Sequence, residues 1–92
     1  MKYQIVITSI CKKDIKRASK QGRNIDLLFE IIDRLSNGEV LEPKYKDHSL
    51  SGNYKGKREC HIEPDFLLIY QIIDDELTLY ALRVGSHSNL FR

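Results

Sequence analysis

Three histidines in the second half of the chain are the residues best suited to chemistry. His48 follows a lysine and an aspartate, His61 lies four positions before the turn residue Asp65, and His87 follows a glycine and a serine near the C-terminus. Imidazole ordinarily has a pKa of about 6.5, so it can take up or release a proton near neutral pH. Three imidazoles and a carboxylate on a basic chain therefore predict acid–base chemistry on an anionic substrate.

Each of these residues also has an ordinary structural explanation. His48 can be a surface loop residue, His87 can simply end the strand before it, and Phe91 can pack a terminal turn onto the sheet. Asp65 follows a proline and is a typical turn residue. His61 lies between two apolar residues in an extended segment, so its side chain is expected to point away from the apolar side.

Length and composition limit the class of protein. A chain of 92 residues predicts a single domain spanning residues 1–92, and 41% hydrophobic with 30% charged residues is typical of a globular protein. No apolar run approaches the roughly 20 residues of a membrane span, and the N-terminus lacks the apolar region of a signal peptide. We therefore expect a cytoplasmic protein without a membrane partner. The two cysteines have no metal-ligand spacing, and no glycine-rich phosphate or dinucleotide motif is present, so reduced thiols, no metal and no cofactor are predicted.

The formal net charge of +2 hides two basic segments. The first contains one acid, Asp14, among the basic residues Lys12, Lys13, Lys16, Arg17, Lys20 and Arg23. The second contains one acid, Asp47, among the basic residues Lys44, Lys46, Lys55, Lys57 and Arg58. A basic stripe is often only a solvated helix face, but two in a small domain favour a polyanionic partner, either nucleic acid or an acidic protein.

The first half of the sequence predicts a strand and two helices. Alternation from Lys2 to Thr8 predicts the strand, and Thr8 or Ser9 can cap the helix that follows. This helix is expected to end at the glycine at position 22, and its apolar stripe consists of Cys11, Ile15 and Ala18.

A second helix is expected between Asn24, as its N-cap, and the Asn37–Gly38 stop signal. Its buried face is predicted to contain Ile25, Leu28, Phe29, Ile31, Ile32 and Leu35.

The second half predicts a loop followed by three strands. Residues Glu39 to Gly52 read as a polar loop, and strands are expected over Asn53 to Ile62, Phe66 to Ile73 and Leu77 to Val84. The order is β-α-α-β-β-β, an α+β fold with two N-terminal helices packed on one face of a mainly antiparallel four-stranded sheet. The other face is expected to stay partly open, where strand ends can bring His61, Asp65 and Arg83 together.

Two stretches carry a family resemblance. The sequence HSLSGNYKGKRECHIEPDFLLIY, from His48 to Tyr70, and RVGSHSNLF, from Arg83 to Phe91, resemble the signature regions of YafQ-type toxins in the RelE/ParE toxin–antitoxin superfamily. The resemblance covers essentially the whole chain, including the order of its elements. It implies a RelE-like domain that cleaves mRNA on the ribosome as an endoribonuclease and is neutralised by a cognate antitoxin protein.

Carried over residue by residue, the resemblance implies four catalytic positions, which are His48, His61, Asp65 and His87. It also implies RNA contacts from Arg83, near the scissile phosphate, and from the aromatic ring of Phe91; Arg58 and Lys57 are secondary candidates for RNA binding. Arg58 can equally be the partner of a nearby carboxylate.

Two departures from the family pattern are visible. Phe66 stands where relatives often have tryptophan, and Val84 replaces a more usual threonine. The first keeps an aromatic ring and the second removes a hydroxyl but no titratable group, so neither weakens the assignment.

Two other classes of function remain open. A non-catalytic ParE-like inhibitor of DNA gyrase on the same fold needs no set of histidines, so the three histidines argue against it. A metal-dependent hydrolase could use the histidines and Asp65, but metal sites favour short ligand spacings on rigid elements. Here only His61 and Asp65 are close in sequence, and a proline turn separates them. The ribonuclease interpretation is therefore preferred.

Overall fold

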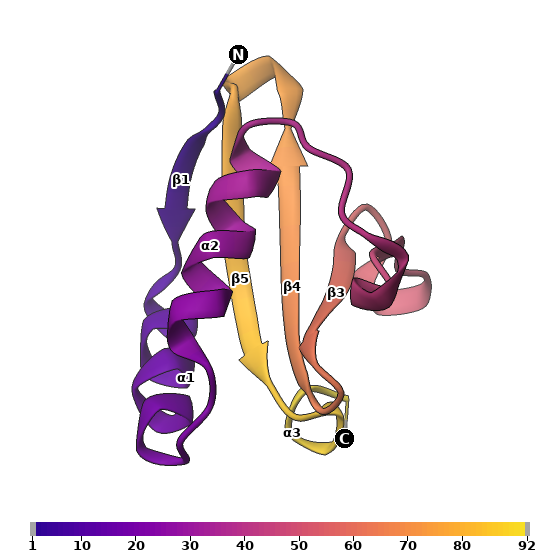
Figure 1. Ribbon diagram of the computed structural model, residues 1–92. Helices are drawn as coiled ribbons and strands as arrows, with labels where there is room; N and C mark the ends of the chain where they lie inside the picture. Colours follow the sequence, from indigo (N-terminus) through magenta and orange to yellow (C-terminus); the bar gives the residue numbers. More distant parts are fainter. Residues whose placement is uncertain (1, 92) are drawn as a thin grey trace.

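The sheet is the framework that positions every candidate residue. The computed structural model describes residues 2–91, so residues 1 and 92 of the predicted domain lie outside the described part. Five strands lie in the order β1-β5-β4-β3-β2 (Figure 1). They are β1 (Gln4–Ile7), β2 (His48–Ser49), β3 (Arg58–Glu63), β4 (Phe66–Ile73) and β5 (Thr78–Gly85). Strand β1 runs parallel to β5, and the other neighbouring pairs are antiparallel.

The predicted N-caps of the two long helices are confirmed. Helix α1 (Ser9–Lys20) begins where the hydroxyl of Thr8 accepts the Cys11 N–H at 3.1 Å. Helix α2 (Ile25–Ser36) begins where the side chain of Asn24 accepts the Leu27 N–H at 3.1 Å. Both contacts satisfy backbone donors that a helix N-terminus leaves without a partner. The other helices are short: α3 (His87–Leu90) and the 3₁₀ turns η1 (Pro43–Tyr45), η2 (Gly52–Tyr54) and η3 (Asp74–Glu76).

The α+β class and the β-α-α-β-β-β order are confirmed, with a fifth strand added. Strand β2 lies inside the predicted loop Glu39–Gly52, and its two residues are too few to show an alternating pattern. The expected strand Asn53–Ile62 is wrong in its first half, because the chain there turns. Gly56 has a φ of +88°, and the Leu50 N–H donates to the Lys57 carbonyl at 2.9 Å, so the strand starts at Arg58.

Two apolar clusters lie on opposite sides of the sheet. The larger, which we call the helix face, packs α1 and α2 against β3, β4 and β5, and its fully buried members include Leu28, Ile31, Leu68 and Leu79. In Figure 1, α2 lies over the sheet and α1 continues from β1 beside the lower part of β5. Phe29 was expected on the buried face of α2, but it is 43% exposed because it lies one position past Leu28 and turns toward solvent.

The smaller cluster lies on the opposite side of the sheet, which we call the histidine face. It consists of Leu67, Ile69 and Leu90, with Leu50, Tyr54, Leu82 and Phe91 packed against them. It is covered only by α3 and the η2 region, so part of this side stays accessible, as the sequence predicts. Within residues 2–91, no helix is long and apolar enough to cross a membrane.

Candidate active site

Two of the candidate histidines meet at one carboxylate that the sequence did not single out. In the antiparallel pairing, His48 lies opposite Glu59, and His61 lies two residues further along β3. The Oε1 atom of Glu59 is 3.5 Å from His48 Nε2 and 3.4 Å from His61 Nε2, and only 5% of Glu59 is exposed. A buried carboxylate requires partners, so these imidazoles can stabilise its charge while it fixes their positions.

The strand register places the remaining polar candidates on the same side of the sheet. Glu59 pairs with Ile69, and Ile69 pairs with Arg83, so one row crosses β3, β4 and β5. The neighbouring row pairs His61 with Leu67. Residues directly opposite one another in a sheet share a face, and Leu67 and Ile69 belong to the histidine-face cluster. Glu59, His61 and Arg83 therefore share the histidine face.

Asp65 and His87 meet through the backbone. Asp65 lies in the turn between β3 and β4, and its Oδ1 atom accepts the His87 N–H at 3.0 Å, at the beginning of α3. The expected effect of this carboxylate on an imidazole ring is not what the contact provides; it anchors the segment that carries His87. The ring of His87 packs against Phe91, with centroids 4.9 Å apart, and Phe91 meets the edge of Tyr54 at 5.4 Å.

Arg83 is held in place by a carboxylate from α1. Its Nε and Nη2 atoms donate to the two oxygens of Asp14 at 2.7 and 3.2 Å, and the Val84 N–H donates to the same carboxylate at 3.2 Å. The side chain of Asp14 is 3% exposed, whereas that of Arg83 is 31% exposed. The hydrogen bonds to Asp14 raise the pKa of Arg83 above its ordinary value. Arg83 is therefore a permanently charged group fixed at the accessible side of the sheet.

Arg58 takes the second of its two predicted roles, as the partner of a carboxylate. Its Nε atom lies 3.3 Å from both Asp47 Oδ1 and the Tyr70 hydroxyl, which itself donates to Asp47 at 2.6 Å. Burial opposes the charge of Arg58, but these two hydrogen bonds outweigh it and raise the pKa of the guanidinium. Lys57 is half-buried beside it, and its carbonyl closes the turn with Leu50.

The two departures from the family pattern lie in the helix-face core. Phe66 is fully buried there, with the guanidinium of Arg23 5.6 Å from its ring centroid, and Val84 is 2% exposed. Both cysteines are buried free thiols, and burial is the main cause that raises the pKa of each to about 12. They therefore carry no nucleophile near neutral pH.

Within the described part of the chain, no group of three or more His, Cys, Asp or Glu side chains is arranged to hold a metal ion. The carboxylates are instead distributed: Glu59 serves two histidines, Asp65 the backbone of α3, and Asp14 the guanidinium of Arg83. The sequence missed Glu59 and Asp14 as site residues. Alternation along β3 places Glu59 and His61 on one face, which is a signal for Glu59; Asp14 had none beyond being the only acid in a basic stretch.

Comparisons with known proteins agree on one family. Residues 3–92 match the sequence model of the bacterial toxin of type II toxin–antitoxin systems, YafQ. The mRNA interferase toxin YafQ of Escherichia coli is 40% identical over 80 residues, which cover 86% of this chain and 85% of the relative. A metal-bound toxin from Helicobacter pylori is similar in structure, with a TM-score of 0.91, 45% identity and coverage of 97% and 99%. In the E. coli DinJ-YafQ toxin–antitoxin complex, the matched chain gives 0.89, 35% identity and full coverage of both chains.

Proposed function

Because the chain belongs to the YafQ family of toxins of type II toxin–antitoxin systems, we propose that it is an endoribonuclease that cleaves mRNA on the translating ribosome. The observation that carries this proposal is the placement of His48 and His61 on one buried carboxylate, on the same side of the sheet as Arg83. The alternative, a non-catalytic inhibitor of DNA gyrase, would give this arrangement no task.

The proposed chemistry uses the nucleophile that RNA carries itself, the 2′-hydroxyl. Cleavage needs a base to take the proton of this hydroxyl, an acid to protonate the leaving 5′-oxygen, and positive charge beside the phosphate. A general acid and a general base each contribute on the order of 10²–10⁴-fold. Arg83, fixed by Asp14, is suited to the phosphate because its charge is permanent and its position is already set.

The two proton transfers are assigned to different parts of the site. In an in-line displacement the attacking and leaving oxygens lie on opposite sides of phosphorus. We therefore assign one transfer to the pair His48 and His61 and the other to His87, which lies on the separate α3 segment. Asp65 positions that segment through its contact with the His87 N–H, and the exposed part of the Phe91 ring offers a surface for stacking an RNA base.

Two partners follow from the family and the charge. A cognate antitoxin is supported by the solved DinJ-YafQ complex of E. coli. The basic outer face of α1, carrying Lys12, Lys13 and Lys16, is proposed to meet either the antitoxin or ribosomal RNA in the cytoplasm.

The chemistry of the cleaved ends tests this proposal. Attack by the internal 2′-oxygen leaves a 2′,3′-cyclic or 3′-phosphate and a 5′-hydroxyl, and it needs no catalytic metal. Cleavage of mRNA on translating ribosomes should persist when a zinc-selective chelator is added with other divalent ions held constant. Its pH profile should be bell-shaped around neutrality, where histidine ordinarily titrates.

Other results would identify the alternatives. A 5′-phosphate end would indicate an activated water and a metal-dependent hydrolase. Intact message together with loss of DNA supercoiling would assign the chain to the gyrase-directed class.

A further inference from the structure

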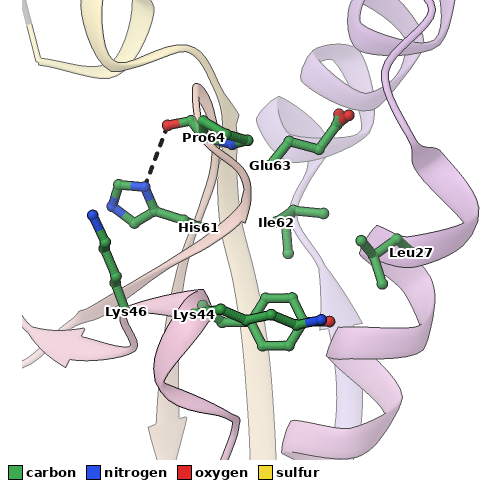
Figure 2. Close-up of a pocket in the computed structure, with 8 residues that line it drawn as sticks. Leu27, Lys44, Lys46, His61, Ile62, Glu63 and Pro64 are labelled. Carbon is green, nitrogen blue, oxygen red and sulfur yellow. Dashed lines mark hydrogen bonds between the residues drawn. The ribbon is translucent and has the colours of Figure 1, made fainter.

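A hollow of about 400 Å³ lies beside His61, outside the cluster described above (Figure 2). It is bounded by α2, by η1 and by the turn after β3. It exists because β2 pairs only with Arg58 and Glu59, which leaves the outer edge of β3 without a strand neighbour from Cys60 onward. Its volume lies within the range of about 300–1,000 Å³ that is typical of small-ligand sites.

The lining of this hollow is apolar at its base. Leu27 contributes from α2, Tyr45 from η1 and Ile62 from β3, and Tyr45 and Ile62 are 8% and 4% exposed. Because these three side chains come from three separate elements of the core, the surface they form is fixed. Apolar and aromatic side chains of this kind accept the flat face of an unstacked nucleic-acid base.

The rim of the hollow is cationic. Lys44 and Lys46 line it, and within residues 2–91 neither forms an ion pair with a carboxylate. The nearby acid, Glu63, already accepts the Asn24 N–H at 3.1 Å, at the beginning of α2. Figure 2 shows the Lys46 ammonium directed toward the ring of His61. An anion entering the hollow therefore meets two cations whose charge is not already compensated.

His61 joins this hollow to the candidate active site. The same imidazole lies 3.4 Å from Glu59 and lines the hollow. The turn continues the connection, because Pro64 lines the hollow and the next residue, Asp65, holds the start of α3. A nucleic-acid strand that presents its reacting sugar to His61 can therefore place a neighbouring nucleotide in the hollow.

We propose that this hollow binds one nucleotide of the RNA substrate next to the cleaved bond, with its base against Leu27, Tyr45 and Ile62 and a phosphate at Lys44 and Lys46. This inference rests on the proposed function, which supplies RNA as the substrate. The apolar base and the unpaired lysines favour a nucleotide, and the contact with His61 places that nucleotide beside the reacting one.

The test uses the full chain and a single-stranded hexaribonucleotide with 2′-O-methyl sugars, which cannot be cleaved because the nucleophile is blocked. Binding is followed by the NMR signals of the Leu27 and Ile62 methyl groups and by affinity measured at several salt concentrations. We expect both methyl signals to shift. Each phosphate contact on a single strand contributes about 0.7 to the slope of log affinity against log salt, so Lys44→Gln with Lys46→Gln should flatten the slope by about 1.4.

A matched variant separates a local contact from general charge. Lys12→Gln with Lys13→Gln removes the same two charges from exposed positions of α1 that do not line the hollow. This variant should leave the Leu27 and Ile62 shifts in place and change the slope for the hexanucleotide by clearly less than the Lys44 and Lys46 pair does.

The proposal is overturned if the methyl signals of Leu27 and Ile62 do not move, or if the two double variants lose affinity and slope equally. It is also overturned if the Lys44 and Lys46 pair weakens only antitoxin binding, because the hollow would then belong to a protein interface. Cleavage of ribosome-bound mRNA by the unaltered chain is measured separately. If cleavage is absent while the oligonucleotide still occupies the hollow, the proposed function fails and the binding site stands.

Discussion

The helix face and the histidine face of the sheet are held together by different interactions. On the helix face, contacts are between apolar side chains such as Leu28, Ile31 and Leu68, which are fully buried. On the histidine face, a small apolar cluster is bordered by hydrogen-bonded charges, of which Glu59 and Arg83 are the centres. Apolar burial accounts for most of the stability of a folded domain, whereas fixed charges are costly to hold and suit chemistry. We therefore expect substitutions to separate stability from activity according to the face they affect.

The largest effect is expected at His87. Its replacement by alanine should slow mRNA cleavage by about 10²–10⁴-fold, which corresponds to about 2.7–5.4 kcal/mol of activation free energy, and should relieve growth arrest. The reason is that the imidazole lies exposed at the start of α3, where it adds little to the core. Cleavage rate on ribosomes and the thermal unfolding midpoint are measured together. Full toxicity with unchanged folding would show that the acid–base assignment at this position is wrong.

The helix face should behave in the opposite way. Leu28→Ala should lower the free energy of unfolding by about 2–5 kcal/mol, because Leu28 is fully buried beneath α2. Cleavage per folded molecule should stay unchanged. Phe29→Ala is the control on the next residue, and its loss should be much smaller because Phe29 is 43% exposed. Denaturant titration gives both values; equal losses at the two positions would contradict the packing described for α2.

Asp14 connects the two faces and should affect both properties. Asp14→Asn keeps the shape of the side chain but removes the charge that holds Arg83 and weakens the contact with the Val84 N–H. We expect a loss of about 1–3 kcal/mol in unfolding free energy together with slower cleavage. Asp33→Asn, at an exposed position of α2, is the matched control. A variant that loses stability but cleaves normally would show that Arg83 needs no positioning by α1.

The same division explains what could be predicted from the sequence. The helix face follows from local patterns: the periodicity of Leu28, Ile32 and Leu35, and the caps Thr8 and Asn24, lie within a few residues of the helices they define. These features predicted both helices and the order of the elements. The exposed side of α2 was less certain, because Phe29 is apolar without being buried.

The histidine face depends on contacts between distant positions. Asp14 and Arg83 are 69 residues apart in sequence, and Glu59 reaches His48 only because the short β2 pairs with β3. No local pattern reports such contacts, since they are set by strand register. The residue types of the site could therefore be named in advance from the histidines and the family motif, but their partners could not.

The smallest effect is expected from the basic outer face of α1. Lys12, Lys13 and Lys16 are exposed, and Asp14, the one acid among them in sequence, is turned inward and paired with Arg83. The outer face is therefore more cationic than the sequence alone suggests. Replacing the three lysines with glutamine should flatten the salt dependence of ribosome binding, by up to about 0.9 in slope for each lysine that contacts a phosphate of duplex RNA. Stability should change little, because substitutions at exposed positions away from packed contacts usually change it by less than about 0.5 kcal/mol.

The slope is the informative measurement, because affinity at one salt concentration mixes phosphate contacts with every other interaction. Cleavage of a short free RNA by the triple variant is the control, and it should be nearly unchanged because the histidine face is intact. If the slope for ribosome binding is also unchanged, α1 does not meet ribosomal phosphate, and its charge is then left to the antitoxin. If free RNA cleavage falls as well, substitution on α1 has disturbed Asp14 and hence Arg83, and the division between the outer face of α1 and the site would have to be withdrawn.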